Sequence, residues 1–325
     1  MTAFVHNILV VGGNGFVGSA VCKAALARGM QVTSISSSGR SYKTPKGHSP
    51  AWTSKVNWLK ADALDPSSYA RLLPDKTAIV HTLGTLFEDT RYKAALKSGN
   101  LGAVAGSFLG SMLGGTGNPL AAGSNSKGSY ETINRDSALR VCETFVSGDH
   151  QSAEVTGPRP FVYLSAEDIF RPFIPSGYIE TKRHAELGIS AITRSQPGYR
   201  GVYIRPSLIY HPYIRPLTTP IATLLDLSAT LHRKLPPNLP TPSNVLRSIG
   251  SALSDNTSTP SEGLSPSSFS SVANALVIPP IHVDHVAEAI CLAIQNDDVA
   301  GVVGVKEMRD LIGWSYKGAS PQTSS

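Results

Sequence analysis

Residues 8–18 of the chain read ILVVGGNGFVG, an apolar run that is followed at once by a cluster of glycines. The run at residues 8–11 is rich in β-branched side chains, which is typical of a strand buried on both faces. Residues 19–28 have a helical pattern that ends at Gly29, and residues 31–36 read as a second strand. Together they predict a strand, a glycine turn, a helix and another strand within about thirty residues.

The glycine turn fits two spacings that are typical of dinucleotide binding. Gly13, Gly15 and Gly18 match G-x-G-x-x-G, and Gly12 with the last two matches G-x-x-G-x-x-G. Glycine lets the backbone turn tightly and approach a pyrophosphate, whose charge the N-terminus of the next helix stabilises. Glycine turns also serve packing alone, but this one lies between a strand and a helix, which favours a cofactor site. The residues expected to bind the cofactor are Gly12, Gly13, Asn14, Gly15, Phe16, Val17 and Gly18.

The end of the second predicted strand bears on which nucleotide binds. An NAD site usually carries Asp or Glu about 20 residues after the loop, where it holds the ribose 2′-hydroxyl. Residues 36–40 here are Ser-Ser-Ser-Gly-Arg and contain no acid. Arg40 can pair with a 2′-phosphate, so we expect Ser36 and Arg40 to bind the cofactor, with NADP(H) favoured over NAD(H). The alternative is that Arg40 is a solvated loop cation.

Strand-like and helical patterns alternate along the rest of the chain. Strands are predicted at 56–61, 78–82, 161–165, 202–205 and 275–283, and helices at 67–73, 130–145, 177–189 and 284–294. This alternation predicts an α/β fold, a Rossmann-type doubly wound parallel sheet, with a small C-terminal region for a substrate or partner.

The predicted Rossmann domain covers residues 1–210 and contains a glycine-rich insertion at residues 98–128. The C-terminal region covers residues 211–316 and contains a mobile Pro/Ser-rich insertion at residues 235–271. The polar tail, residues 317–325, is expected to be disordered.

Within the glycine-rich insertion, glycines recur every four residues from Gly102 to Gly114. A helix over residues 101–113 would be about 20 Å long, too short for the ~30 Å hydrocarbon core of a membrane. A flexible loop is favoured, because each glycine costs a helix about 1 kcal/mol. The alternative is a segment that packs on a partner or on a membrane surface.

Further candidates follow predicted strands, at the sheet edge where open α/β folds bind ligands. Asp62 follows the third strand, where it can meet an adenine ring or cap a helix. His81 ends the fourth strand and is followed by Leu83 and Gly84. We expect this segment to contact the cofactor through its backbone, with His81 as a proton donor the weaker interpretation.

Tyr178 and Lys182 are four residues apart on a predicted helix and therefore share a face. A tyrosine with its free pKa of about 10 is a poor acid–base group at neutral pH, and a lysine one turn away lowers that pKa. Such pairs are also common on surfaces. Here a strand ending in Ser165 precedes the pair by 178 − 165 = 13 residues, which favours a site.

With the glycine loop, Ser165, the Tyr178/Lys182 pair and Arg205-Pro206, the chain resembles the short-chain dehydrogenases/reductases over residues 7–294. Residues 281–287, IHVDHVA, are similar to the extended and atypical branch of that family. The segments GGNGFVG, VHTLG, GNPL and PSGYI look closest to one group, the fungal mitochondrial dehydrogenase-like proteins associated with coenzyme Q (ubiquinone) biosynthesis. The NADPH-binding accessory subunit of respiratory complex I is a more distant likeness.

The resemblance implies a role for each matching residue. Tyr178 would be the general acid–base group, and Lys182 its partner and a ribose ligand. Ser165 would polarise the reacting carbonyl or hydroxyl, Asn134 would support a proton-relay water, and Arg205 would close over the nicotinamide end. In extended members the catalytic Ser or Thr often lies one or two positions later, where this chain has Ala166 and Glu167.

Composition narrows the other classes. The 325 residues carry a net charge of +6, but the cations are dispersed and aromatics make up only 7%, so we expect no nucleic-acid binding. The three cysteines share no metal-ligand spacing, and we expect no metal site. No apolar run is long enough for a membrane span, and no secretory signal is present. The Ser-rich start, free of acids before Asp62, resembles a mitochondrial transit peptide in composition. Because the first predicted strand begins by about Asn7, we expect these residues to belong to the fold, with an uncleaved import signal as the alternative to a removable leader.

Three functions are open at this point. The first is an NADP-dependent oxidoreductase of mitochondrial coenzyme Q biosynthesis that transfers a hydride to or from a quinone precursor. The second is a non-catalytic NADPH-binding assembly or regulatory subunit, either of the coenzyme Q biosynthetic complex or of the complex I accessory type. Both imply pathway subunits as partners and a matrix-side location with peripheral inner-membrane contact. The third and weakest is an epimerase or dehydratase of nucleotide sugars.

Overall fold

A computed structural model of the chain describes residues 4–84, 131–148, 157–169, 174, 176–214, 218–234, 241–254 and 268–314. Its strands are β1 (Asn7–Val11), β2 (Gln31–Ser36), β3 (Asn57–Lys60), β4 (Ala78–His81), β5 (Arg159–Leu164), β6 (Tyr199–Ile204), β7 (Ile209–Tyr210), β8 (Ile281–His282) and β9 (Gly301–Val303). Its α-helices are α1 (Phe16–Ala27), α5 (Ser137–Ser147), α6 (Ser176–Arg194), α7 (Thr218–Lys234), α8 (Pro242–Ser254), α9 (Ser268–Val277), α10 (Val283–Gln295) and α11 (Val305–Leu311). The short helical turns are η1 (Ala51–Lys55), η2 (Pro66–Ser68), η3 (Ala70–Leu72) and the π-helix η4 (Glu131–Asp136).

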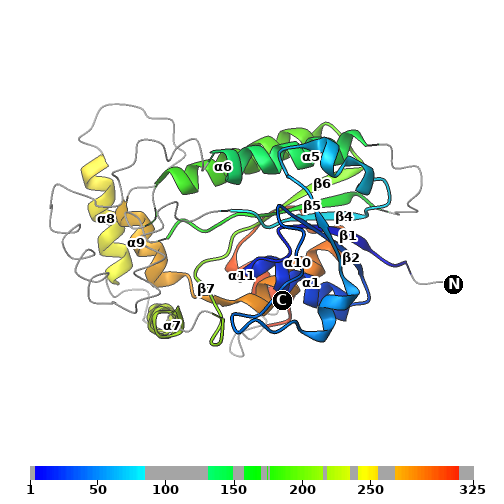
Figure 1. Ribbon diagram of the computed structural model, residues 1–325. Helices are drawn as coiled ribbons and strands as arrows, with labels where there is room; N and C mark the ends of the chain where they lie inside the picture. Colours follow the sequence, from blue (N-terminus) through cyan, green and yellow to red (C-terminus); the bar gives the residue numbers. More distant parts are fainter. Residues whose placement is uncertain are drawn as a thin grey trace, which may run out of the picture.

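Seven parallel strands form the main sheet in the order β3-β2-β1-β4-β5-β6-β9. From β1 the chain moves outward through β2 to β3 and then returns to the central strand β4 on the other side of β1. This reversal places a crevice at the carboxyl ends of β1 and β4, where open α/β sheets bind ligands. The predicted Rossmann-type doubly wound sheet is confirmed (Figure 1).

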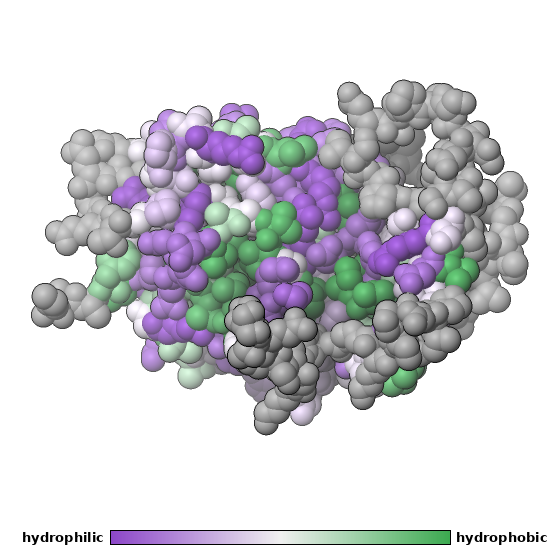
Figure 2. Space-filling view, turned by 180° about the vertical axis from the view of Figure 1, so that it is seen from behind, coloured by the Kyte–Doolittle hydropathy of each residue, from purple (hydrophilic) through white to green (hydrophobic). Residues whose placement is uncertain are grey.

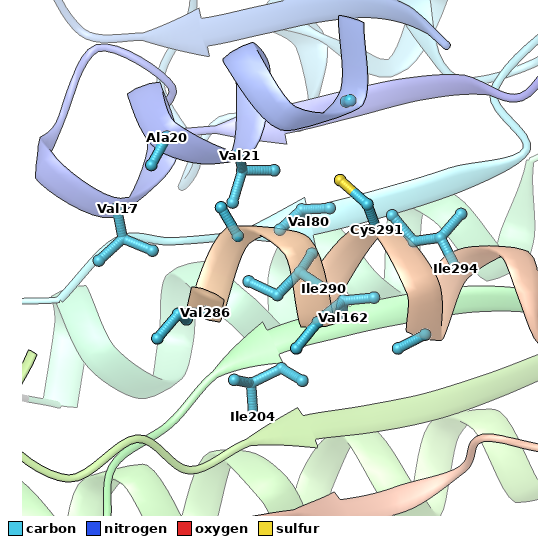
Figure 3. Packing of buried hydrophobic residues seen from close by; sticks show 14 of the residues in the cluster. Val17, Ala20, Val21, Val80, Val162, Ile204, Val286, Ile290, Cys291 and Ile294 are labelled. Atoms are coloured by element: carbon cyan, nitrogen blue, oxygen red, sulfur yellow. The ribbon is translucent and has the colours of Figure 1, made fainter. Parts of the chain in front are cut away.

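Helices cover both faces of the sheet: α5 and α6 lie on one face, and α1, α10 and α11 on the other (Figure 1). Alternate residues of β1 supply the two cores, because successive side chains of a strand point to opposite faces. Ile8 and Val10 belong to the core under α1 and α10, whereas Leu9 and Val11 belong to the core under α5 and α6. Figure 3 shows the first core where α1 meets α10 over the sheet. Burial on both faces explains why β1 is an unbroken apolar run.

The main sheet is not confined to residues 1–210. The edge strand β9 pairs with β6, and the apolar side of α10 packs on α1 (Figure 3). The C-terminal part of the chain therefore completes the Rossmann layers as well as adding α7, α8 and α9 beside them (Figure 1). The chain returns to the main sheet because the apolar side of α10 requires burial.

Three predicted elements are wrong in detail. Residues 275–283 were expected to form one strand, but α9 continues to Val277 and β8 has only two residues; a short apolar run fits either structure. Residues 67–73 form two 3-10 turns in place of a helix, after Asp65 caps the first turn at Pro66. Within the predicted mobile insertion 235–271, residues 242–254 form α8.

Apolar side chains also reach the surface, and Figure 2 shows them gathered near the middle of one face between polar areas. On α7, Leu224, Leu227 and Leu231 are more than half exposed and form one stripe, since they lie three or four residues apart. Among the described helices, none is both long and apolar enough to cross a membrane. The glycine-rich insertion 98–128 and the tail 317–325 lie outside the described residues.

Candidate cofactor-binding site

The glycine turn between β1 and α1 is built for close backbone approach. Gly12 has φ +85°, a conformation that favours glycine, and its amide donates to the carbonyl of Ile35 at 2.8 Å. A Cβ on Gly13 would lie 2.3 Å from Ser34 Oγ, and a Cβ on Gly18 would lie 2.2 Å from Gly12 O. Side chains larger than hydrogen therefore do not fit at these positions without moving the turn.

Helix α1 begins at the end of this turn with Gly15 at its cap position. Gly15 has no side chain that could cap the helix, and the first turn contains no acidic residue. The positive end of the helix dipole favours an anion at this position. The residues present therefore fit the pyrophosphate of a dinucleotide.

Two cavities open at this sheet edge, and Leu83 lines both. The smaller, of about 140 Å³, lies beyond the ends of β1, β2 and β3 and includes Ser36 and Asp62. The larger, of about 380 Å³, runs from the glycine turn to the start of α6. The predicted residues that line the larger cavity are Gly12, Asn14, Gly15, Phe16, Val17, Gly18, Leu83, Gly84, Ser165, Tyr178 and Lys182.

Lys182 lies at the centre of the larger site and is only 1% exposed. Its Nζ donates to the carbonyls of Leu164 at 2.8 Å and Leu83 at 3.3 Å, and lies 5.9 Å from the centre of the Tyr178 ring. Burial lowers the pKa of Lys182 to about 7, although Glu186 acts in the opposite direction. The amine can therefore gain or lose a proton near neutral pH.

Gly84 and Asn134 lie against this amine. A Cβ on Gly84 would lie 2.9 Å from Lys182 Nζ and 3.2 Å from Asn134 Oδ1, so a side chain there would displace both. Asn134 is fully buried in the π-helix η4, where its carbonyl accepts from Tyr163 Oη at 2.5 Å. Asn134 does not line the cavity, and its role in a proton relay stays a prediction.

Ser165 lines the larger cavity, but its hydroxyl is engaged by the protein. Its Oγ donates to Glu186 Oε1 at 2.5 Å and accepts from Arg183 Nη1 at 3.1 Å. These contacts disfavour Ser165 as the group that polarises a substrate carbonyl. That role of Ser165 stays a prediction.

Arg205 lies apart from the position that the resemblance implied. Its guanidinium pairs with buried Glu186, with Nε 2.9 Å from Oε1, and it lines neither cavity. Pro206, the next residue, lines the larger cavity, and the closing of Arg205-Pro206 over the nicotinamide end stays a prediction. We call Ser165, Arg183, Glu186 and Arg205 the α6 charge cluster.

His81 also lies away from both cavities, fully buried between the rings of Phe161 and Tyr163. Its Nε2 lies 3.2 Å from Ser137 Oγ, and burial lowers its pKa to about 3. A histidine that stays neutral at physiological pH and does not reach the cavity does not fit the role of a proton donor to substrate.

The loop after β2 gathers polar groups beside the glycine turn. Asn14 Nδ2 donates to Ser38 Oγ at 3.2 Å, and the amide of Gly39 donates to Ser36 Oγ at 3.1 Å. Arg40 is exposed, and its guanidinium makes no hydrogen bond or ion pair within the described part of the chain. It does not line the smaller cavity, so its contact with a 2′-phosphate stays a prediction.

One group of potential metal ligands occurs among the described residues: His211, His282 and Asp284. Nδ1 of His211 accepts from the amide of Tyr213 at 3.1 Å, and Nδ1 of His282 accepts from the amide of Asp284 at 3.2 Å. An accepting Nδ1 leaves the ring proton of a neutral histidine on Nε2, so neither ring offers a free lone pair. We therefore assign no metal to this group.

The sequence interpretation missed Glu186 and Arg183, and it noted Glu167, which lines the larger cavity, only as a departure from the family pattern. Glu186 lies four residues after Lys182, and the spacing Tyr178, Lys182, Glu186 places all three on one face of α6. That spacing was a usable signal for Glu186, and the i,i+3 spacing was one for its pair with Arg183. The pairing of Glu186 with Arg205 depends on the fold and was not readable.

Comparison with known proteins agrees with this class of site. Residues 8–98 match the NAD dependent epimerase/dehydratase family, a class that binds a nicotinamide dinucleotide. Two solved structures share the fold: a 3-oxoacyl-(acyl-carrier protein) reductase from Brucella melitensis in complex with NAD, and a short-chain type dehydrogenase/reductase from Mycobacterium ulcerans. The first has a TM-score of 0.56 at 11% identity, covering 93% of this chain and 96% of that one. The second has 0.54 at 15% identity, covering 94% and 90%.

Two relatives match nearly the whole chain. The chain is 30% identical to MIOREX complex component 2 of Saccharomyces cerevisiae over 311 residues, which are 94% of this chain and 99% of that protein. It therefore belongs to the same family as that protein. An uncharacterised chloroplastic protein of Arabidopsis thaliana is 25% identical over 94% of this chain and 77% of its own length.

Proposed function

We propose that this protein is an NADP(H)-dependent oxidoreductase that acts on a quinone precursor in mitochondrial coenzyme Q biosynthesis. The observation that carries the oxidoreductase assignment is that Tyr178 and Lys182 line the same cavity as the glycine turn. The nicotinamide, when bound, supplies or accepts a hydride. The preference for NADP(H) is supported by the absence of an acid at residues 36–40 and by Arg40 in that loop. The pathway is supported by the family resemblance alone.

In this proposal the protein positions the reactants and moves one proton. Tyr178 Oη gives a proton to the oxygen of a carbonyl as the hydride arrives, or takes it back in the reverse direction. Lys182 uses two donor positions on the carbonyls of Leu164 and Leu83. As an ammonium it retains a third N–H for the ribose, and its charge favours the ionised form of Tyr178.

A second candidate is a non-catalytic NADPH-binding subunit of an assembly. It is favoured by the engagement of Ser165 with Glu186 and Arg183, which removes the hydroxyl that the hydride chemistry would use. The relative in Saccharomyces cerevisiae is named as a component of the MIOREX complex, which also supports a role as a subunit of an assembly. In this reading the bound nucleotide adds stability without turnover. Peripheral contact with the inner membrane is proposed for both candidates, and neither involves nucleic acid.

Cells that lack the gene separate these two candidates. They are complemented with wild type or with the Tyr178→Phe, Lys182→Met double variant, and quinones and protein levels are measured. The oxidoreductase proposal expects wild type to restore coenzyme Q and the variant to accumulate a precursor at normal protein level. Full restoration by the variant would support the subunit candidate, and unchanged coenzyme Q in the deletion cells would exclude the pathway. Fractionation of the same cells checks the mitochondrial location.

A further inference from the structure

Glu167 lines the larger cavity and takes no part in the steps proposed for Tyr178 and Lys182. It follows β5, and its backbone amide donates to the carbonyl of Pro206 at 2.9 Å, which fixes it between the ends of β5 and β6. Pro206 and Glu167 both line the larger cavity. Among the described residues, none forms a hydrogen bond or salt bridge with the Glu167 carboxylate. A half-buried carboxylate that the described part of the chain leaves without a hydrogen bond has acceptor positions that a ligand can use.

The fold makes room for this side chain. A Cβ on Gly304, in the turn between β9 and α11, would lie 3.1 Å from Glu167 Oε1. The neighbouring carboxylate Glu307 is already used, since its Oε2 accepts from the amide of Gly304 at 3.1 Å. Glycine at position 304 thus lets the two carboxylates lie on either side of the turn without a clash.

The charge around Glu167 is close to balanced. The guanidiniums of Arg183 and Arg205 both bind Glu186, so the α6 charge cluster holds two cations and one anion. Glu167 supplies the second carboxylate nearby; burial raises its pKa, as do the carboxylates Glu186 and Glu307, whereas Arg183 and Arg205 act in the opposite direction. The charges of Arg183, Arg205, Glu186 and Glu167 together nearly cancel. A cationic ligand therefore gains little here, whereas a neutral hydrogen-bond donor can bind without further charge compensation.

The remaining wall at this end of the cavity is apolar and is formed by Ile169, Ile174, Leu208 and Ile209. Among the described lining residues, Lys182 is the only one with a cationic side chain, and its amine already donates to two carbonyls. Phosphate recognition in proteins commonly uses arginine or lysine side chains. Among the described residues that line this end of the cavity there is no arginine, which favours an uncharged substrate over a nucleotide sugar.

We infer that Glu167 accepts a hydrogen bond from the hydroxyl of an uncharged, largely apolar substrate that occupies the Ile169–Ile209 end of the cavity. The inference names the substrate class for the proposed oxidoreductase and so rests on that function. It makes Glu167 a specificity-determining residue, and phosphorylated sugars are expected to bind more weakly than such a substrate.

The test is a calorimetric titration of the full chain, with and without saturating NADPH, against three probes: 2-naphthol, 2-methoxynaphthalene and UDP-glucose. The methyl ether keeps the apolar ring but has no hydroxyl donor. Wild type is expected to bind 2-naphthol at least roughly tenfold more tightly than the ether, as for a hydrogen bond to a charged group. UDP-glucose is expected to bind more weakly than either.

Two variants locate the effect. Glu167→Ala is expected to bind 2-naphthol and the ether equally, whereas Glu143→Ala, which changes an exposed carboxylate on α5, keeps the preference. Failure of wild type to prefer 2-naphthol, a preference that survives in Glu167→Ala, or tighter binding of UDP-glucose would overturn the inference. The preference for 2-naphthol is also measured without NADPH. If the chain does not bind NADPH, the proposed function is refuted, and the preference of the free chain still tests the role of Glu167.

Discussion

At the β1–α1 end of the sheet edge the site is made of backbone, whereas at the β5–α6 end side chains line the site and a cluster of charged residues lies beside it. The glycine turn excludes side chains at Gly13 and Gly18 and exposes the start of α1. Beside the second end, the α6 charge cluster holds Ser165, Arg183 and Arg205 around one buried carboxylate, Glu186. The first construction depends on local conformation, so it tolerates change elsewhere in the chain. The second depends on contacts between β5, α6 and β6, so it fails as a unit when one charge is removed.

The largest effect is expected from Glu186→Ala, at the β5–α6 end. The substitution leaves the guanidiniums of Arg183 and Arg205 without their buried partner, and the free energy of unfolding should fall by roughly 3–5 kcal/mol. Urea denaturation measures the change. Glu143→Ala, at an exposed position on α5, is the control and should change it by about 0.5 kcal/mol or less. Equal values for the two variants would mean that the cluster adds no stability.

The next effect tests the β1–α1 end. A Cβ introduced by Gly18→Ala would lie 2.2 Å from Gly12 O, so the turn must move. We expect a loss of about 1–3 kcal/mol in stability and a loss of NADPH affinity greater than roughly tenfold. Gly198→Ala is the matched control, because a Cβ there meets no heavy atom within 4 Å. Unchanged NADPH affinity in Gly18→Ala would contradict a site built on this turn.

Lys182, between the two ends, gives a pH signature. Its pKa in the folded protein is about 7, below the ordinary 10.5, so between these values the unfolded chain holds a proton that the folded chain lacks. Stability should therefore rise with pH across this window, by at most about 1.4 kcal/mol per pH unit. The Lys182→Met variant should lack this rise of stability with pH. The control variant Lys55→Met should keep it. Parallel stability curves for wild type and Lys182→Met from pH 7 to 9.5 would refute the buried, partly deprotonated amine.

Ser165→Ala separates structure from catalysis at the β5–α6 end. Because its hydroxyl bonds to the Glu186 carboxylate, we expect a loss of about 1–2 kcal/mol in stability. We also expect the variant to restore coenzyme Q in the deletion cells as wild type does. A variant present at normal level that restores none would assign a catalytic role to Ser165 after all.

The smallest effect concerns the loop after β2. Arg40→Ala should weaken NADPH binding by up to roughly fivefold and leave NADH binding unchanged, since an exposed charge pair contributes little. Lys43→Ala, another exposed cation on the same loop, should change neither. An equal loss for both nucleotides would show that Arg40 does not read the 2′-phosphate.

The two ends also differed in how far the sequence could predict them. The glycine spacing identified the turn and the start of α1, and the alternation of strands and helices identified the parallel sheet, because both depend on local pattern. Ser165 and Arg205 were assigned to a reacting group by position along the chain, yet their side chains bind Glu186. That pairing arises only when β5, α6 and β6 meet. His81 was likewise placed at the correct sheet edge, but which side of β4 its ring faces depended on strand pairing.

Hydrogen–deuterium exchange of the full chain with and without NADPH reports where the nucleotide binds. We expect slower exchange of the backbone amides in residues 12–18 and 83–84 and at the start of α6 when NADPH is present. Wild type that shows no protection at these segments under saturating NADPH, or protection only elsewhere, would contradict a dinucleotide site at this edge of the sheet.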